Sequence, residues 1–234
     1  MTAIDNNVVQ ATNILASQGG RTMDTVVRDI LNGGTNVIYA PKVADGVETA
    51  VTSRATLDAT AQLTVDLIDQ AVAMLQAQNA DPIGDSYVAI VHPYTSYDIR
   101  KDPNWIEAHK YAAPDALFNG EIGELHGVRF IENVFAPVLG VAGTSADGDD
   151  EYVNKSRSRT YATYFFGKDS FGIIDPEGGA LEMIVHDKGE IGGPLNQFST
   201  IGYKFETNGA TILYPERLLR VMSCSSFSAS DETN

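Results

Sequence analysis

Residues 86–135 read SYVAIVHPYTSYDIRKDPNWIEAHKYAAPDALFNGEIGELHGVRFIENVF, and this stretch decides the fold. Its first part, Tyr87–Val91, is a continuous apolar run, which is typical of a strand covered on both faces. His92-Pro93 ends the run. Because the stretch holds three of the four histidines and the only tryptophan, it is also the first place to look for a chemical site.

The second half of the stretch predicts a helix and another strand. Asp102-Pro103 is a good helix start, with aspartate as the cap and proline at the first helical position, and residues 104–111 follow as the helix. Asn119-Gly120 indicates a turn, and residues 127–135 predict the second strand. A strand, a helix and a strand at this spacing indicate an α/β or α+β unit.

A long helix is predicted near the start of the chain. One face is marked by residues that recur every three or four positions. They are Val8, Thr12, Leu15, Gly19, Met23, Val26 and Ile30. Asn32-Gly33-Gly34 provides the C-terminal stop. Since Gly19-Gly20 lies in the middle, we expect either an interruption into two short helices or a close packing partner on that face.

The clearest helix is predicted to begin at Leu63. Thr64 is a plausible N-cap and Asp66 favours the first turn. The shared apolar face consists of Val65, Ile68, Ala71, Val72 and Leu75. Upstream of it, residues 35–40 predict a short strand and residues 41–61 a polar loop.

The chain beyond residue 160 is predicted to be mainly β. Short apolar or alternating segments are typical of strands. They cover residues 161–166, 171–174, 181–186, 201–206, 212–214 and 218–222. Residues 139–159, rich in Gly, Ser and Asp, predict a surface loop, and residues 223–234 predict a disordered polar tail.

Composition excludes several classes of function. The chain has 234 residues and a net charge of −15, with no basic run that could neutralise phosphates, so tight nucleic-acid binding is disfavoured. No apolar run approaches the roughly 20 residues of a membrane span, and the start shows no signal peptide. The single cysteine, Cys224, cannot form an internal disulfide.

The candidate chemical residues do not form a motif. His92, His109, His126 and His186 lack the i, i+4 spacing of a helical metal site, so we expect no metal and no cofactor. No GxSxG occurs, and Cys224 has no neighbouring histidine in the sequence. The acidic cluster at residues 147–151 has the glycine and the distal glutamate of a calcium loop out of place, so we interpret it as a solvated loop.

Several segments resemble the major capsid proteins of tailed bacteriophages, in the N-four-like branch. DPNWIEAHKYA and LFNGEIGELHGVRFIENV carry the sharpest similarity, within residues 102–134. Upstream, RTMDTVVRDILNGGTNVIYA and LTVDLIDQAVAMLQAQNA look like the spine helix and the helix that follows it. Downstream, FFGKDSFGIIDPEGGALEMIVHDKG and PLNQFSTIGYKF look like the late strands, so the resemblance covers about residues 14–222.

The resemblance implies an α+β Hong Kong 97-type capsid fold. Residues 1–62 would form the spine helix and connector of the peripheral domain, and residues 63–171 the axial domain. Residues 172–222 would return to the peripheral domain, before the tail at 223–234. The implied function is self-assembly into hexamers and pentamers of an icosahedral head that encloses double-stranded DNA. The virion would be its location, after synthesis in the host bacterial cytoplasm.

The resemblance also implies partners, and the chain differs from the family pattern at one place. Beyond copies of itself, the chain could meet portal, scaffold or decoration proteins. The family's N-terminal arm and extended loop precede the spine helix, and only about a dozen residues stand there in this chain. We therefore expect weak or partial assembly from this chain alone.

The expected site is a set of assembly contacts, without catalytic residues. The candidates in and after the axial helix are Trp105, Tyr111, Asn119, Gly120, Glu121 and Gly123, together with the loop at residues 139–159. Local core packing is an equal alternative for Trp105. A nanocompartment shell of the same fold is the alternative function. An enzyme that uses His92, His126 or His186 is the alternative of another class.

Overall fold

The computed structural model describes residues 2–110, 122–140, 159–174, 181–186, 199–205 and 209–227. The chain divides into two compact units, each described here by itself. The helix unit comprises residues 1–31 and 172–211, and the sheet unit comprises residues 32–171 and 212–234. Residues 32–62 and 212–222, assigned to the peripheral domain from the sequence, therefore belong to the sheet unit.

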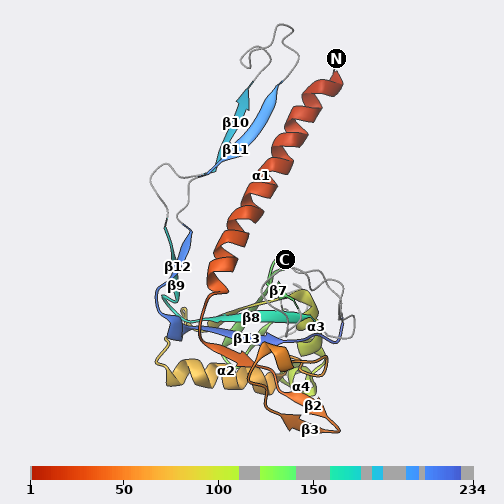
Figure 1. Ribbon diagram of the computed structural model, residues 1–234, viewed down its shortest axis with the longest axis vertical. Helices are drawn as coiled ribbons and strands as arrows, with labels where there is room; N and C mark the ends of the chain where they lie inside the picture. Colours follow the sequence, from red (N-terminus) through yellow and green to blue (C-terminus); the bar gives the residue numbers. More distant parts are fainter. Residues whose placement is uncertain are drawn as a thin grey trace. The chain divides into compact units, whose positions relative to one another are not determined.

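The helix unit is built on α1 (Thr2–Leu31), an uninterrupted helix of 30 residues. Beside it lies the antiparallel pair of β10 (Glu182–His186) and β11 (Thr200–Lys204) (Figure 1). A Cβ at Gly19 would stand 3.0 Å from Leu181 Cδ1 and 3.6 Å from Tyr203 Cδ2. Close packing, the second of the two expected outcomes, therefore explains the glycine in the helix.

The sheet unit contains a seven-stranded sheet within the described residues, in the order β1-β13-β8-β4-β6-β5, with β7 paired to β8. The strands are β1 (Val37–Tyr39), β4 (Tyr87–Val91), β5 (Glu124–Leu125), β6 (Val128–Glu132), β7 (Val138–Leu139), β8 (Thr160–Phe166) and β13 (Leu218–Ser223). β1 is parallel to β13 and β4 to β6, and the other pairs are antiparallel. All seven residues of β8, near the middle of the sheet, are buried.

Helix α2 (Val65–Ala77) covers one face of this sheet (Figure 1). The Thr64 hydroxyl caps it by accepting a hydrogen bond from the Leu67 amide at 3.4 Å. The predicted cap and apolar face are confirmed, since Ile68, Ala71 and Leu75 are all 0% exposed. Burying a large aliphatic side chain, as at Ile68 and Leu75, contributes about 1.5–3 kcal/mol.

Two short helices follow β4, and the sequence predicted only the second. At His92-Pro93, where the sequence indicates only the end of a strand, α3 (Pro93–Lys101) begins. The His92 Nδ1 atom caps it by accepting a hydrogen bond from the Tyr94 amide at 3.3 Å. The helix predicted from Asp102-Pro103 is confirmed as α4 (Pro103–Lys110).

The Asp102 carboxylate joins the starts of two helices. Its Oδ1 atom accepts a hydrogen bond from the Asn104 amide at 2.9 Å, and its Oδ2 atom accepts one from the Val65 amide at 3.0 Å. Each bond satisfies an amide that the helix geometry leaves unpaired. Asp102 therefore fixes α4 relative to α2.

The loop predicted at residues 41–61 contains regular structure. β2 (Lys42–Ala44) and β3 (Val47–Thr49) form an antiparallel hairpin, and η1 (Arg54–Thr56) is a short 3₁₀ helix. At the tip, Asp45 and Gly46 have φ angles of 52° and 77°. Two successive positive φ angles are those of a type I′ turn, which favours an Asp-Gly pair.

The prediction of a disordered tail from residue 223 is wrong for residues 223–227. Ser223 completes β13, and Cys224 and Ser225 are buried. The Ser225 hydroxyl donates to the Tyr94 carbonyl oxygen at 3.1 Å, and the Ser226 amide donates to Asp98 Oδ2 at 3.0 Å. Internal hydrogen bonds thus hold a polar segment whose composition predicted disorder; residues 228–234 lie outside the described residues.

Shorter strands complete the pattern predicted for the C-terminal half. β9 (Phe171–Ile173) pairs with β12 (Ala210–Ile212), and η2 (Pro215–Arg217) leads into β13. The predicted strands at residues 161–166, 181–186 and 218–222 are confirmed as β8, β10 and β13. Among the described residues, no helix has the length and apolarity to cross a membrane.

Candidate assembly surfaces

Trp105 lies in the core of the sheet unit. Its side chain is 4% exposed, and its ring packs edge-to-face on Phe130 at a centroid distance of 5.6 Å. Phe130 in turn contacts Phe165 at 6.4 Å. This packing explains the burial of the tryptophan within its own chain, and its role as an assembly contact stays a prediction.

Of the other predicted contacts, only Gly123 falls among the described residues. It has a φ angle of 106°, which favours glycine, and its carbonyl oxygen accepts a hydrogen bond from the Phe130 amide at 3.3 Å. It therefore shapes the start of the β5–β6 hairpin. Tyr111, Asn119, Gly120 and Glu121 lie outside the described residues, as do residues 141–158 of the acidic loop.

The histidines lie apart and have separate surroundings. His92 caps α3 and stacks at 4.9 Å on Tyr161. His126, in the β5–β6 turn, has its Nδ1 atom 3.0 Å from Asp69 Oδ1, with both side chains nearly half exposed. His186 ends β10 in the helix unit. The side chain of His109 is outside what the structure describes.

Within the described ranges, no three His, Cys, Asp or Glu side chains come together in a way that could hold a metal ion. Cys224 is fully buried, and its burial raises the pKa of the thiol to about 12. A thiol with so high a pKa supplies almost no thiolate near neutral pH.

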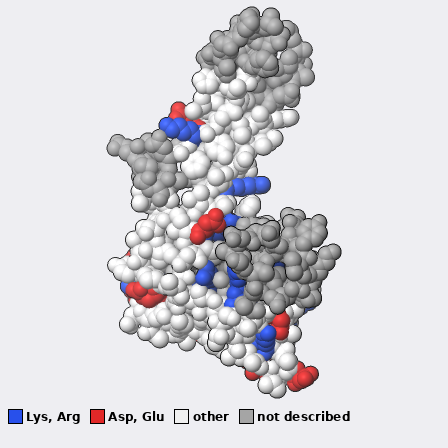
Figure 2. Space-filling view, viewed as in Figure 1, with Lys and Arg blue, Asp and Glu red and all other residues white. Residues whose placement is uncertain are grey.

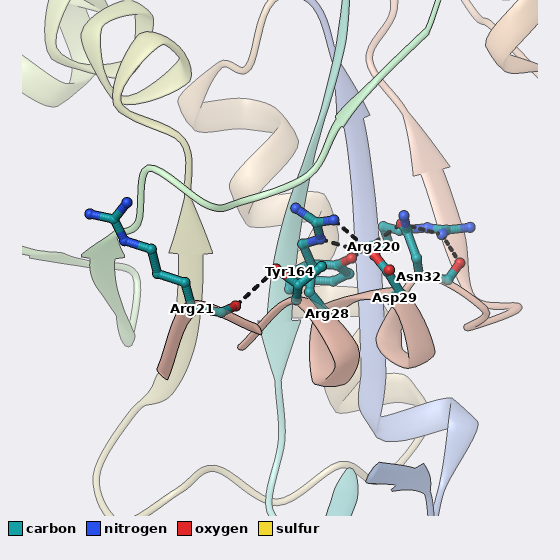
Figure 3. A network of polar contacts seen from close by, with 7 residues as sticks. Arg21, Arg28, Asp29, Asn32, Tyr164 and Arg220 are labelled. Atoms are coloured by element: carbon teal, nitrogen blue, oxygen red, sulfur yellow. Dashed lines mark hydrogen bonds and ion pairs between the residues drawn. The ribbon is translucent and has the colours of Figure 1, made fainter. Parts of the chain in front are cut away.

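A hydrogen-bonded cluster around Arg220, which we call the Arg220 cluster, fixes the first residues of the sheet unit to its central strands. Asn32 Oδ1 accepts hydrogen bonds from Arg220 Nη1 at 3.0 Å and from the Tyr164 hydroxyl at 3.1 Å (Figure 3). Arg220 also donates to the carbonyl oxygens of Asn32 and Gly34. The guanidinium thereby holds the segment that leads from Asn32 into β1.

The charge of Arg220 is compensated mainly by dipoles. In the described part of the chain, its hydrogen-bond acceptors are carbonyl oxygens of the backbone and of Asn32, and no ion pair is formed. The pKa of Arg220 is lowered below the ordinary value for arginine, and desolvation by burial is the largest cause. The planar fork holds its donors in a fixed arrangement that binds two carbonyl oxygens at once, whereas an ammonium group has no such rigid fork.

Among the surfaces of the sheet unit that expose apolar side chains, two are the β2–β3 hairpin and a patch beside α3. The first is the β2–β3 hairpin, where Val43 is 40% exposed and Val47 is 65% exposed. The second, which we call the α3 patch, consists of Tyr97, Lys101 and Phe227. Tyr97 is 40% exposed and Phe227 56% exposed, and their rings meet edge-to-face at 5.2 Å.

Comparison with known proteins decides the family. A protein-family model described as "Phage capsid protein" matches residues 3–172, well over half of the chain. The chain belongs to the phage capsid protein family. The resemblance found in its sequence is therefore confirmed. No curated protein matches the chain.

Solved capsids share the architecture of this capsid protein. The head structure of Helicobacter pylori bacteriophage KHP40 aligns with a TM-score of 0.62 and 12% identity over 93% of this chain and 69% of that one. The capsid of Helicobacter pylori bacteriophage KHP30 gives 0.61 and 14%, with the same coverage. The cyanophage Pam1 capsid gives 0.58 and 14% over 82% of this chain and 55% of that one.

These similarities confirm the predicted Hong Kong 97-type α+β fold. The chain spans between about half and two thirds of the length of the capsid chains it matches. Its family points to a structural protein.

Two features escaped the sequence analysis although the sequence carried a signal for each. Asp45-Gly46 lies between KVA and VET, and an Asp-Gly pair between short apolar segments is among the strongest signals for a hairpin. Pro93 follows a side chain that can accept a hydrogen bond, which is typical of the first position of a helix. No local signal indicates that Arg220 contacts Asn32, 188 positions away.

Proposed function

We propose that this capsid protein is a major coat subunit that self-assembles into the hexamers and pentamers of an icosahedral head. The head would enclose double-stranded DNA. The observation that carries the proposal is the family match over residues 3–172 in a chain with the capsid fold. The expected partners are copies of the same chain, with portal, scaffold or decoration proteins as further partners.

The electrostatics of the chain support containment of DNA without binding. The net charge of −15 comes from 31 acidic residues against 16 lysines and arginines. Affinity for a nucleic-acid backbone depends on clustered cations and the counterions that they release. An acidic shell wall would repel phosphate and leave packaged DNA free to move.

The packing of the sheet unit supports a structural role. Trp105, Phe130 and Phe165 form a continuous aromatic core, and Arg220 ties the segment after Asn32 to the central strands. A subunit that meets many copies of itself benefits from surfaces that are held in one geometry, because less conformational entropy is lost on association. We propose that no residue of the chain is catalytic and that it needs no cofactor.

Assembly of the purified chain tests the proposal. We expect capsomers, tubes or shells in electron micrographs, and a mass above that of the monomer by light scattering that rises with concentration. A strict monomer at all accessible concentrations would contradict self-assembly by this chain. Particles recovered from host cells should contain DNA; particles filled with one protein would instead favour a nanocompartment shell.

A further inference from the structure

The β2–β3 hairpin stands apart from the core of its unit. It pairs with no other strand among the described residues, and none of its six strand residues is buried. The register places Val43 opposite Glu48 and Ala44 opposite Val47, so the two valines lie on opposite faces. Each face of the hairpin therefore presents a valine that is at least 40% exposed.

The base of the hairpin is nevertheless held firmly. Thr60 Oγ1 accepts a hydrogen bond from the Val43 amide at 3.1 Å and donates to Asp58 Oδ1 at 2.5 Å. Lys42 Nζ lies 3.4 Å from Asp58 Oδ2. A two-stranded hairpin alone is only marginally stable in water, and these contacts, with the Asp-Gly turn, keep it formed. It is thus an ordered projection with uncovered apolar side chains.

The far end of the hairpin is acidic. Asp45 and Glu48 are exposed, and within the described residues no lysine or arginine pairs with either of them. Lys42, the one cation of the hairpin, is engaged by Asp58 at the base. Figure 2 shows acidic side chains at the end of the sheet unit where Figure 1 places β2 and β3.

The α3 patch is cationic and aromatic, and so complements the acidic, valine-bearing hairpin. Lys101 Nζ lies 4.0 Å above the Tyr97 ring, and no carboxylate pairs with it in the described part of the chain. The neighbouring carboxylates are engaged elsewhere: Asp98 accepts from Ser226, and Glu132 binds Arg100 and Ser96. The patch therefore combines two half-exposed aromatic rings with a cation that lacks a counter-charge.

We propose that the β2–β3 hairpin of one copy docks on the α3 patch of a second copy. In a chain with a charge of −15, most surfaces of two copies repel each other. The acidic, valine-bearing hairpin and the cationic, aromatic patch can meet with both charge and apolar complementarity. Because the two surfaces differ, the contact is heterologous, and such contacts generate rings when the rotation closes. The proposal rests on the proposed self-assembly and names the surfaces that would carry it.

A charge exchange tests the docking. Glu48→Lys and Lys101→Glu should each weaken self-association about tenfold by concentration-dependent light scattering, because each places like charges together. The double variant should recover to within about threefold of the unaltered chain. Lys168→Glu is the matched control, an exposed lysine elsewhere in the sheet unit, and should not rescue Glu48→Lys. The docking would be overturned if the two single variants, their double variant and the Glu48→Lys/Lys168→Glu control all associated equally, with unchanged circular dichroism.

Cross-linking separates the docking from the proposed function. Val43→Cys and Tyr97→Cys chains, mixed after separate purification, should form a disulfide between two copies, because Val43 shares the hairpin face of Glu48. The native Cys224 is 0% exposed and should not react. Particles without this cross-link would overturn the docking and leave the coat function standing. Cross-linked oligomers that never form capsomers or shells would support the docking and contradict the coat function. Monomers without a cross-link would contradict both.

Discussion

Strand β8 and the β2–β3 hairpin are both short β segments of the sheet unit, and they differ in what surrounds them. All seven residues of β8 are buried between β13 and β4, whereas no strand residue of the hairpin is buried. Both contain residues that favour strands, so intrinsic preference does not separate them. What differs among the described residues is the number of neighbouring strands, because β8 is flanked on both sides and the hairpin is not. Flanked residues stabilise the subunit, and exposed residues are available for association.

The largest expected effect is in β8. Phe165→Ala removes a fully buried ring that contacts Phe130, and should lower the free energy of unfolding by about 3–5 kcal/mol. Urea denaturation of monomeric protein, followed by the fluorescence of the single Trp105, measures this loss. The same experiment on Val43→Ser, on the hairpin face of Glu48, should give a change within about 1 kcal/mol.

The two variants should rank in the opposite order when the loss of self-association by folded subunits is measured. Val43→Ser should reduce self-association while the subunit stays folded, and any loss of association by Phe165→Ala should follow its loss of folded protein. A cost of several kcal/mol for Val43→Ser would show that the hairpin belongs to the folding core, and the comparison would fail.

A smaller loss of stability is expected at the Arg220 cluster beside β8. Arg220→Met removes the bonds to the oxygens of Asn32 and Gly34 and keeps much of the aliphatic volume. Since hydrogen bonds from charged groups contribute about 1.5–3 kcal/mol, and desolvation of the guanidinium offsets part of this, we expect a loss of about 2 kcal/mol. Arg220→Lys is the matched control, which retains the charge without the planar fork.

Chemical denaturation of both Arg220 variants, at neutral pH, measures the contribution of the fork. Arg220→Lys should recover less than half of the loss, because lysine lacks the rigid planar fork whose donors match the positions of the Asn32 and Gly34 oxygens. Full recovery by lysine would mean that charge, and not the fork, holds the segment between Asn32 and β1.

The sequence predicted those parts of the fold that depend on local patterns. The face of α2, its Thr64 cap and the Asp102-Pro103 start were correct because periodicity and capping are properties of neighbouring residues. The role of Gly19 stayed open because it depends on Leu181, a distant residue. The family likewise came from the resemblance of whole segments, since no residue carries a coat function by its chemistry.

The assembly candidates were harder to predict from the sequence. Trp105 was an equal choice between core and interface, and its contact with Phe130 places it in the core. The hairpin and the α3 patch were absent from the candidates, because exposure depends on tertiary contacts. Phe227 was placed in a disordered tail, although its neighbour Ser226 is bound by Asp98.

The smallest expected effect is a pH dependence at the base of the hairpin. The hydrogen bond from the Thr60 hydroxyl is the largest of several contacts that lower the pKa of Asp58 below its ordinary value of 3.8. A carboxyl group with a lowered pKa in the folded state stabilises the fold above its unfolded pKa, and this contribution is lost as pH falls through the folded pKa. Because Asp58 is about half exposed, we expect less than about 1 kcal/mol.

Amide exchange of Val43, whose N–H donates to Thr60 Oγ1, reports this effect locally. Between pH 6 and pH 3, after correction for the intrinsic exchange rate, its protection should decrease, whereas that of the β8 amides should change much less. Asp58→Asn keeps an oxygen acceptor for Thr60 but cannot titrate, so its Val43 protection should be lower at pH 6 and nearly independent of pH. An unchanged pH profile in Asp58→Asn would show that another group controls the base of the hairpin. A matching loss of protection in β8 would show that the hairpin and the central strand open together. The hairpin could then not be treated as a surface for association that is independent of the stability of the core.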